Sequence, residues 1–473
     1  MRDREVRLAD LADAVGGRVV GDGDVHVRDI ATDSREVRHG DLFVCVPGHT
    51  VDGHDFAAGA VAGGAVALVA ERPVATEVAT IMVDSVRAVV GPLAAAFFDH
   101  PSRDLTVVGV TGTNGKTTVT HLVAAAARGG GHSAVALGTL SGLRTTPEAV
   151  ELQRNLDRMR GQGVGVVALE VSSHALAQGR VAGTRFAVSV FTNLSPEHLD
   201  YHRTMDDYEA AKARLFDPSL SQAAVVNTDD PAGRRIVARL AIPCVEVSPS
   251  ATTGVSSGPG STSMDWRGGS LEVPLGGSFM VADALLAAEA ALLCGVDEAA
   301  VRAGLRSVAA VPGRFEVVAD GADGALVIVD YAHTPDALAT TLDSARSFAP
   351  GRLTVVFGCG GDRDTAKRPV MGDIAARRAD RVVITSDNPR TENPAAIAAA
   401  ILDGVDENHR PHVEVELDRR RAISIALDDA GVGDVVVVAG KGHETTQDIG
   451  GVVTPFDDRA VVASLLAPGE GAP

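Results

Sequence analysis

Residues 106–118 read TVVGVTGTNGKTT, and the alanine-rich stretch VTHLVAAAA at 119–127 follows directly. The valine-rich run at 106–110 predicts a buried strand, the glycines after it predict a tight turn, and the alanine-rich stretch predicts a helix. This order is a βα unit. Three further apolar runs, at 164–169, 186–191 and 223–227, alternate with helical segments in the same way. We therefore expect a parallel sheet with helices on both faces.

The turn inside this βα unit has the composition of a phosphate-binding loop. Its glycines let backbone N–H groups point at phosphate oxygens, and the N-terminus of the helix adds partial positive charge. Lys116 would reach the outer phosphates and Thr117 would ligate magnesium. The general pattern GxxxxGK[ST] is missed by one position, because glycine stands at 109 and not at 110. An ordinary glycine-rich turn remains the alternative, although the strand, loop and helix context favours a nucleotide.

The length and charge of the chain limit its organisation and its partners. At roughly 150 residues per domain, 473 residues suggest about three domains. The formal net charge of −19 argues against a protein that binds a nucleic-acid backbone. Lysine is scarce, since only four of the 43 basic residues are lysines, at positions 116, 212, 367 and 441. Because a compact ammonium and a guanidinium are not interchangeable, these four positions are candidates for chemistry.

The distribution of strand-like runs divides the chain into three α/β blocks. We predict an N-terminal domain at 1–103, a central domain at 104–311 and a C-terminal domain at 312–473. A Ser/Thr/Gly-rich stretch at 248–270 predicts a loose loop. The third block again alternates strands and helices, which predicts a second doubly wound domain. Outside the central block, strands are expected at 41–46, 65–69, 325–329, 353–357, 381–385 and 434–439.

The cysteines and the apolar segments indicate a cytoplasmic protein with no membrane partner. The four cysteines, at 45, 244, 294 and 359, are dispersed, so neither a disulfide framework nor a CxxC zinc or redox site is expected. The charged N-terminus contains no apolar stretch of signal-peptide type. The longest apolar run, at 56–70, is shorter than the roughly 18 to 20 residues that span a bilayer and predicts a buried helix and strand.

Acidic and imidazole side chains follow two of the central strands. Glu170 directly follows the apolar run at 164–169, at the carboxyl edge of the expected parallel sheet, where metals or ligands bind. A helix N-terminus capped by Ser172 or Ser173 is the alternative, and the two interpretations are compatible. The segment SPEHLDYH at 195–202 packs two histidines and two acids beside a strand end, which predicts either a metal site or a polar turn.

A lysine on the next helical segment has two interpretations. Helical spacing puts Tyr208 and Lys212 on one face. A bare ammonium cannot bind magnesium, but a carbamate formed on Lys212 by carbon dioxide would offer an oxygen pair suited to a hard cation. A solvated lysine beside packed Leu215 and Phe216 is the alternative.

Three polar loops follow strands of the third block. They read GCGGDRD at 358–364, DNPR at 387–390 and GKGHE at 440–444. Loops at one edge of a doubly wound sheet converge on the crevice where ligands bind. Because they combine acids with arginines, they suit a zwitterionic ligand, although each alone is compatible with an ordinary turn.

The order of these motifs resembles that of the Mur ligases over nearly the whole chain. The matching segments are TDSR at 32–35, GDLFV at 40–44, GTNGKTT at 112–118, TTPE at 145–148, LEVSSHAL at 169–176, SPEHLDYH at 195–202, YEAAKARLF at 208–216, VDYAHTPD at 329–336, GCGGDRD, DNPR and AGKGHE at 439–444. The resemblance implies a three-domain α/β enzyme of cell-wall synthesis. It has an N-terminal nucleotide-sugar domain, a central P-loop doubly wound domain and a C-terminal Rossmann-like domain. It also implies a cytoplasmic monomer that uses ATP and Mg²⁺ and has only small-molecule partners.

The resemblance assigns roles to residues by position in these motifs. Lys116, Glu170, His198 and Lys212 are the implied catalytic residues, and Thr117, Glu170, His198 and carbamylated Lys212 the metal-binding ones. The implied ATP-binding residues are Gly112, Thr113, Asn114, Gly115, Lys116, Thr117, Thr118, Asp283, Arg314, Asp330 and His333. Those for the nucleotide-sugar are Thr32, Ser34, Thr145, Thr146, Ser172, Gln178 and Arg180. Those for diaminopimelate are Arg363, Asp387, Asn388, Pro389, Arg390, Gly440 and Glu444.

Four positions depart from the pattern of the family. Aspartate stands at 283 where an asparagine near adenine is usual, Met280 and Ala366 replace an asparagine and a glycine, and Arg144 precedes Thr145. An ionised aspartate accepts hydrogen bonds but cannot donate one. The family pattern therefore predicts altered adenine contacts.

The implied reaction extends the peptide of a UDP-linked muramic acid. A carboxylate of UDP-N-acetylmuramoyl-L-Ala-D-Glu attacks the γ-phosphate of ATP, and the amine of meso-diaminopimelate then displaces phosphate from the acyl phosphate. Arg390 or Arg363 would pair with the carboxylate that lysine lacks. We expect the two α/β domains to close before chemistry. The alternatives are a ligase that adds lysine or another amino acid and a non-catalytic binding protein of the same family.

Overall fold

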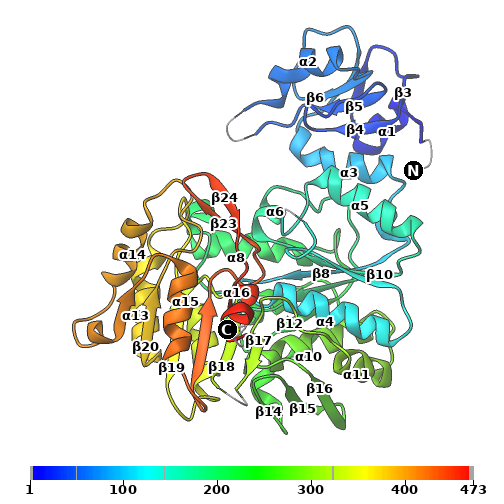
Figure 1. Cartoon of the computed structure of the whole chain (residues 1–473). Helices are drawn as coiled ribbons and strands as arrows, with labels where there is room; N and C mark the ends of the chain where they lie inside the picture. The colour runs from blue at the N-terminus through cyan, green and yellow to red at the C-terminus, as the bar shows by residue number, and fades with distance from the viewer. Residues whose placement is uncertain (1–3, 49–50, 143, 322–323, 468–473) are drawn as a thin grey trace.

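The computed structural model describes residues 4–48, 51–142, 144–321 and 324–467. Within these residues three large sheets follow one another along the chain, each with helices on its faces. The first sheet and its helices stand apart from the other two and join them through α3 (Val86–Phe97) and α5 (Ala149–Gly161) (Figure 1). The α/β class predicted from the sequence is confirmed, whereas the domain boundaries predicted at 103 and 311 stay predictions.

The central sheet is fully parallel and places the glycine-rich loop at its middle. Its order is β13-β12-β11-β8-β10-β9, so β8 lies where the chain turns from one side of the sheet to the other. Ligands bind at such a switch point, beyond the carboxyl ends of the strands. The strands are β8 (Thr106–Thr111), β9 (Ala134–Leu137), β10 (Val166–Glu170), β11 (Val188–Phe191), β12 (Ala224–Asn227) and β13 (Cys244–Val247). The four strands predicted here are confirmed to within two residues at either end, while β9 and β13 were not predicted.

Helices bury both faces of this sheet. Val108 and Val110 of β8 pack with α4 and α10 on one face, while Val107 packs with α5 on the other. This alternation explains the continuous valine run, because every residue of a central parallel strand faces a helix layer. The helices are α4 (Lys116–Gly129), α5 (Ala149–Gly161), α6 (Ser173–Ala177), α7 (Leu199–His202), α8 (Met205–Ala213), α9 (Pro231–Val237), α10 (Met280–Leu293) and α11 (Glu298–Arg306).

The loose loop predicted at 248–270 is wrong. This stretch contains most of a three-stranded antiparallel sheet, formed by β14 (Ser256–Ser257), β15 (Thr262–Trp266) and β16 (Gly269–Val273). Thr262, Met264 and Trp266 are buried on one face of β15, while residues between them are more exposed. Serine and threonine occupy strand positions, and the sheet is stable because its apolar face packs on α10 and α11.

The C-terminal sheet repeats the doubly wound arrangement. Its order is β17-β18-β22-β19-β20-β21, and only the edge strand β17 is antiparallel. The strands are β17 (Glu316–Asp320), β18 (Leu326–Asp330), β19 (Leu353–Phe357), β20 (Arg381–Ile384), β21 (Val413–Val415) and β22 (Val435–Ala439). One face packs on α12 (Pro335–Arg346), α13 (Lys367–Arg378) and α14 (Pro394–Leu402), the other on α15 (Arg419–Asp428) and α16 (Asp458–Leu466). A hairpin, β23 (Thr446–Ile449) and β24 (Val452–Pro455), extends beyond the sheet. The four strands predicted in this part are confirmed.

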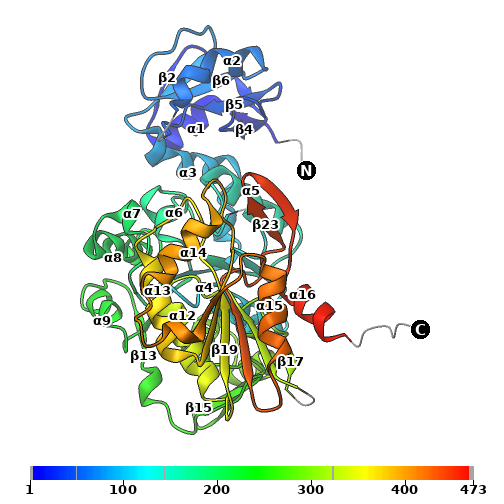
Figure 2. The same cartoon turned by 60° about the vertical axis from the view of Figure 1, so that its left-hand side comes forward.

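The N-terminal sheet is mixed and packs against the central part through one helix pair. Its order is β2-β7-β6-β5-β4, with α3 next to α5 of the central part (Figure 2). The apolar run at 56–70 forms α2 and β6, as predicted. The elements are β1 (Val6–Arg7), α1 (Leu8–Val15), β2 (Arg18–Val20), β3 (His26–Val27), β4 (Asp29–Ala31), β5 (Asp41–Val44), α2 (Ala57–Ala62), β6 (Ala67–Ala70), β7 (Ala79–Met82) and α3 (Val86–Phe97). No helix among the described residues is both long and apolar enough to cross a membrane.

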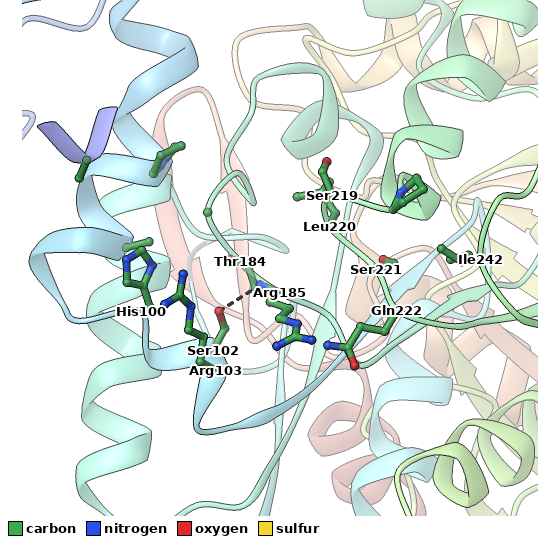
Figure 3. A pocket seen from close by; sticks show the side chains of 15 residues that line it. His100, Ser102, Arg103, Thr184, Arg185, Ser219, Leu220, Ser221, Gln222 and Ile242 are labelled. Carbon is green, nitrogen blue, oxygen red and sulfur yellow. Dashed lines mark hydrogen bonds between the residues drawn. The ribbon is translucent and has the colours of Figure 1, made fainter. Parts of the chain in front are cut away.

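One cavity lies away from the glycine-rich loop. This cavity of about 500 Å³ is lined by His100, Ser102 and Arg103, which belong to the link between the first two sheets, and by residues just before β11 and β12 (Figure 3). Here the backbone N–H of Arg185 donates to Ser102 Oγ at 3.0 Å. These residues stand at the amino edge of the central sheet, whereas the glycine-rich loop follows the carboxyl end of β8. This cavity and the glycine-rich loop therefore lie at opposite edges of the central sheet.

Candidate active site

The glycine-rich loop between β8 and α4 adopts a backbone that only glycine fits. Gly112 and Gly115 have φ angles of 152° and 84°. A Cβ atom at these positions would lie 1.8 Å from Thr192 Oγ1 and 2.5 Å from Asp283 Oδ1. The loop is held from the neighbouring strand, since Asn114 N donates to Asn193 Oδ1 at 2.9 Å. Its conformation presents the N-terminus of α4, as a phosphate site requires.

Lys116 is partly buried against this loop. Its Nζ donates to Gly112 O at 2.9 Å and to Thr113 O at 2.7 Å. Burial lowers the pKa of Lys116, while the carboxylates of Glu197 and Glu170 oppose that change. The ammonium is therefore held at the loop by oxygen atoms, where an anionic ligand would compete for it.

Glu170, at the end of β10, faces the first turn of α4. Thr117 Oγ1 donates to Glu170 Oε2 at 3.0 Å, and Thr139 donates to the same carboxylate from its N–H at 2.9 Å and its hydroxyl at 3.1 Å. Arg314 Nη2 reaches across from the C-terminal part and donates to Thr117 Oγ1 at 3.0 Å. The predicted N-terminal cap is also present, because Ser172 Oγ accepts a hydrogen bond from Ala175 N at the start of α6. Thr117 and Glu170 thus form an oxygen-rich pair beside the phosphate loop.

Glu197 is a site residue for which the sequence predicted no individual role. Its carboxylate lies 3.5 Å from His198 Nε2 and 3.4 Å from His333 Nε2, and Tyr208 donates a hydrogen bond to it. Burial alone would raise the pKa of Glu197, but the hydrogen bond from His333 and the charges of His198 and Lys116 lower it on balance. Glu197 therefore stays ionised and joins the central part to the C-terminal part. Its place between a proline and His198 in SPEHLDYH was the available sequence signal.

Lys212 on α8 is almost fully buried, so the solvated alternative is wrong. Its side chain lies on the same face as Tyr208, with Nζ 4.4 Å from the ring centre, as predicted. Nζ donates to Gly112 O at 2.7 Å. Burial, with a smaller contribution from the nearby charge of Lys116, lowers the pKa of Lys212 well below its usual value. Burial beneath the phosphate loop therefore favours the neutral form of this amine.

The C-terminal sheet faces the phosphate loop with its own carboxyl edge. Arg314 stacks over the Tyr331 ring at 4.4 Å, and Asp336 Oδ2 accepts from Asn114 Nδ2 at 3.0 Å. Asp330 is turned inward, where it accepts from the backbone N–H groups of Phe315 and Ala332 and from Thr341. Predicted ATP-binding residues from two sheets therefore lie close together at the phosphate loop. The Asp330 carboxylate instead binds the backbone N–H groups of the two loops that flank it.

Two of the residues that depart from the family pattern, Asp283 and Met280, belong to the first turn of α10 near the phosphate loop. Asp283 on α10 is 5 % exposed beside Gly115, and burial raises its pKa to about 8, opposed by the charge of Arg314. Met280, one turn earlier, is buried in the core of the central part. Arg144, in contrast, makes an exposed ion pair with Glu148 at 3.6 Å.

Five of the seven predicted nucleotide-sugar residues form one cluster. Thr146 Oγ1 donates to Glu170 O at 2.8 Å, and Arg180 donates to Thr146 O at 3.2 Å and to Gln178 Oε1 at 2.7 Å. Thr145 and Ser172 are joined to the same cluster through hydroxyl contacts. Thr32 and Ser34 follow β4 in the N-terminal part, and within the described residues no hydrogen bond joins them to these five.

The three polar loops of the C-terminal part converge, as predicted. Asn388 Nδ2 donates to Glu444 Oε2 at 2.7 Å, and Arg390 donates through its guanidinium to Gly361 O. Gly440, with φ of 107°, leaves no room for a side chain, since a Cβ would lie 2.6 Å from Asp387 Oδ2. Arg363 and Arg390 both flank Gly360, and Pro389 O lies against Gly361. All seven predicted amino-acid residues thus belong to one loop cluster.

The two remaining lysines are both placed at this edge. Lys441 Nζ donates to Asn388 Oδ1 and Glu444 Oε2 at 3.2 Å each and to Thr446 O at 2.7 Å. Lys367, at the start of α13, donates to His333 O at 2.7 Å. The first lysine therefore supports the amino-acid loops and the second supports a residue of the ATP side.

Three family models match the chain in order. They are the Mur ligase family catalytic domain over residues 26–98, the Mur ligase middle domain over 110–291 and the Mur ligase glutamate ligase domain over 313–442. A protein of Streptomyces coelicolor named UDP-N-acetylmuramoyl-L-alanyl-D-glutamate–2,6-diaminopimelate ligase is 42% identical, with 98% of this chain and 97% of that protein covered. A protein of Gloeobacter violaceus with the same name is 46% identical, with 94% of each chain covered.

Solved structures have the same architecture. A structure of a UDP-N-acetylmuramoyl-L-alanyl-D-glutamate–2,6-diaminopimelate ligase has a TM-score of 0.69 and 33% identity, covering 98% of this chain and 99% of that one. The MurF ligase of Thermotoga maritima, solved in complex with ADP, has a TM-score of 0.65 at 22% identity, with 93% and 97% covered, and shows the fold alone. Taken with the convergence of both loop clusters, these similarities show that the chain belongs to the Mur ligase family.

Proposed function

We propose that the chain is an ATP-dependent ligase that adds meso-diaminopimelate to the D-glutamate of UDP-N-acetylmuramoyl-L-Ala-D-Glu in peptidoglycan synthesis. The observation that carries this proposal is that two loop clusters face each other across one interface. The phosphate loop meets Arg314 and His333 from the C-terminal part, and the amino-acid cluster lies at the same carboxyl edge as those residues. Curated relatives that span nearly the full chain are named for this activity.

The chemistry divides into two transfers. A carboxylate oxygen of the D-glutamate attacks the γ-phosphorus of ATP, so that an O–P bond forms, the bond to ADP breaks and an acyl phosphate results. The neutral amine of the amino acid then attacks the acyl carbon and expels phosphate, with loss of one proton. Lys116, the N-terminus of α4 and Arg314 stabilise the negative charge that spreads over the phosphoryl oxygens. Glu197 contacts His333 across the interface and so links the central and C-terminal parts beside the phosphate loop.

The residues at the phosphate loop fit magnesium. Magnesium binds through one or two carboxylates, with phosphates and waters completing its shell. Thr117 Oγ1 and Glu170 Oε2, 3.0 Å apart, are a pair of this kind, and a larger protein cage is absent from the described residues. His198 and Lys212 would complete the set from the other side of the loop. Bound there, the ion would neutralise the charge of the phosphates and align the transferred group.

The environment of Lys212 supports its carbamylation. Only a neutral amine attacks carbon dioxide, forming a C–N bond and releasing a proton. Burial of Lys212 favours the neutral amine, and the Gly112 carbonyl 2.7 Å away orients it toward the phosphate loop. The resulting carbamate carries two oxygens and a negative charge, which suits a hard cation.

Selection of diaminopimelate rests on the arginines of the amino-acid cluster. Diaminopimelate differs from lysine by one carboxylate, and Arg390 or Arg363, which flank Gly360, would pair with it. A site built around a charge partner rejects the analogue that lacks the charge. The Glu444 carboxylate would receive the ammonium end, and Asn388 holds that carboxylate with its amide Nδ2.

The proposal includes a monomeric cytoplasmic enzyme. One chain contributes every loop of the site, and the reaction consumes ATP. Light scattering of the purified protein tests the first point: a mass near 48.5 kDa is expected, and a stable dimer would contradict it.

The decisive experiment measures phosphate release from ATP with UDP-N-acetylmuramoyl-L-Ala-D-Glu and three alternatives: meso-diaminopimelate, L-lysine or no amino acid. Turnover with diaminopimelate well above the other two is expected. Turnover with lysine alone would contradict the proposed specificity. No turnover with either amino acid would favour a non-catalytic binding protein.

A further inference from the structure

Lys441, in the amino-acid cluster, is a fully buried lysine whose side chain has no contact with solvent. Its side chain is 0 % exposed, whereas the side chain of its partner Glu444 is 31 % exposed. It follows Gly440 at the end of β22 and points beneath the loops, so a ligand in the cluster meets Asn388 and Glu444 and not the lysine. Lys441 therefore acts on a ligand only through other residues.

The three N–H donors of this ammonium have three acceptors. They are Asn388 Oδ1 and Glu444 Oε2 at 3.2 Å and Thr446 O at 2.7 Å. An ammonium has three donors and no acceptor, so the group is fully satisfied. Arginine would bring five donors on a larger planar group, and buried donors without acceptors are costly. This explains lysine here in a chain where 39 of 43 basic residues are arginine.

The acceptors come from three segments that otherwise follow separate strands. Asn388 belongs to the loop after β20, Glu444 to the loop after β22, and Thr446 starts the hairpin strand β23. Lys441 also sets the orientation of the Asn388 amide. Asn388 Oδ1 accepts from Lys441 and from Asp448 N at 3.0 Å, which turns Nδ2 toward the Glu444 carboxylate. Within the described residues, Lys441 is thus the one side chain that bonds both Asn388 and Glu444 from below, and it acts together with the Asp448 N–H in orienting them.

We propose that Lys441 is a positioning residue that sets the selectivity of the amino-acid site without touching the amino acid. The inference rests on the proposed function, because it assumes that Glu444 receives the incoming ammonium. Lys441 holds the Glu444 carboxylate in place, partly neutralises it, and supports the one orientation of Asn388 in which Nδ2 donates to Glu444. Loss of Lys441 removes one donor from each of its three acceptors, so that in the described part of the chain the Glu444 carboxylate keeps only the hydrogen bond from Asn388 and Asn388 Oδ1 only the one from Asp448 N.

The backbone of these loops has a separate support. Arg419, also fully buried, donates to Ala439 O at 2.9 Å and pairs with Asp458 at 2.7 Å. The chain should therefore fold without Lys441. This makes a change in substrate use separable from a loss of structure.

The test compares steady-state kinetics of the wild type with those of Lys441→Met, which keeps the length of the side chain and removes its donors. KM for meso-diaminopimelate should rise about 10- to 100-fold, the size of effect that a displaced binding group produces. KM for ATP and for the nucleotide-sugar should stay within about twofold. Lys441→Arg should show a similar defect, because the charge alone does not reproduce three matched hydrogen bonds.

Lys367→Met is the matched control. It removes the ammonium that donates to His333 O on the ATP side, so it should raise KM for ATP and leave KM for the amino acid unchanged. Thermal unfolding of every variant checks that the fold persists. If Lys441→Met fails to fold, Lys441→Gln, which keeps two N–H donors, takes its place and should raise KM by a smaller factor.

An unchanged KM for the amino acid in a folded Lys441→Met would overturn the inference. So would equal rises in KM for all three substrates, which indicate a general structural defect. Failure of the proposed function has a different signature, because the wild type itself would then not turn over diaminopimelate. If the wild type used another amino acid, the same comparison of variants would be made with KM for that amino acid in place of KM for diaminopimelate.

Discussion

One fully buried lysine, Lys212, lies beneath the phosphate loop of the central part, and another, Lys441, lies in the amino-acid cluster of the C-terminal part. The two lysines differ in their acceptors. Among the described residues Lys212 has one hydrogen-bond acceptor, Gly112 O, and lies near the charge of Lys116, whereas Lys441 has three acceptors, one of them a carboxylate. Burial with few acceptors favours a neutral, reactive amine, while burial with matched acceptors favours a fixed ammonium. The number of acceptors, and not the residue type, therefore separates chemistry from positioning.

The largest expected effect comes from Lys212→Ala. Loss of the proposed carbamate should lower kcat on the order of 1,000-fold, as removal of a group that stabilises phosphoryl charge does. Short-chain carboxylic acids such as acetate should restore part of the activity by filling the space with a carboxylate. The measurement is phosphate release with and without acetate. Wild-type activity of Lys212→Ala in the absence of acetate would contradict a catalytic role for Lys212 and so the proposed difference between the two lysines.

Glu197→Gln tests the link between the two edges. This carboxylate contacts His198 and His333 from opposite sides of the interface. Removing its charge should lower kcat by about 100-fold while KM for diaminopimelate changes little, because the amino-acid cluster has its own supports. The assay is steady-state kinetics with each substrate varied in turn. A selective rise in KM for the amino acid would show that the two edges are not independent.

Arg390→Gln sharpens the same contrast from the amino-acid side. Its guanidinium lies beside Gly360 and Gly361 at the loop cluster. The ratio of kcat/KM for diaminopimelate over lysine should fall about 10- to 100-fold, since only diaminopimelate offers the extra carboxylate. Arg363→Gln is the companion variant, and the larger of the two losses identifies the carboxylate partner. Equal ratios in both variants and the wild type would contradict a role for either arginine.

The smallest expected effect is on stability and comes from Asp283→Asn. Burial raises the pKa of Asp283 from 3.8 to about 8, so the folded chain binds a proton that the unfolded chain has lost between these values. Stability contributed by this group is therefore present below pH 4 and is lost as pH rises toward 8. Asparagine removes that loss, so the variant should gain roughly a few °C in Tm at pH 8 and little at pH 4. A pH-independent difference in Tm would show that Asp283 is ionised throughout.

Much of the fold was predictable because the strands are continuous apolar runs bounded by turns. The runs around Val108, Val190 and Val437 are buried on both faces, which produces the strongest pattern a strand can have. The stretch around Trp266 was mispredicted because its strands are rich in serine, threonine and glycine, and their stability depends on packing against α10 and α11. Short edge strands such as β13 lack a complete apolar face and leave little signal.

Site residues were predictable where a motif concentrates unusual chemistry, and not where a common residue acquires a role by contact. Lys116, Glu170 and Asn388 belong to such motifs, and each lies in a polar cluster at the carboxyl edge of its sheet. Glu197 looks like one acid among several in SPEHLDYH, and only its contact with His333, 136 positions along the chain, distinguishes it. Such a contact depends on how two sheets face each other, which no local spacing encodes.

The sequence by itself determined the α/β class, the phosphate loop and the family. These features depend on local patterns, namely valine-rich strands, the glycines of the turn that follows and a lysine in a chain where lysine is scarce. It also marked Lys212 and Lys441 as positions where arginine was not used. Only the tertiary structure decided that, among the residues it describes, one of them has a single acceptor and lies beneath a phosphate loop, while the other has three acceptors and lies beneath an amino-acid site. The protonation and the role of a buried lysine depend on the acceptors around it, and distant segments supply those acceptors only once the chain has folded.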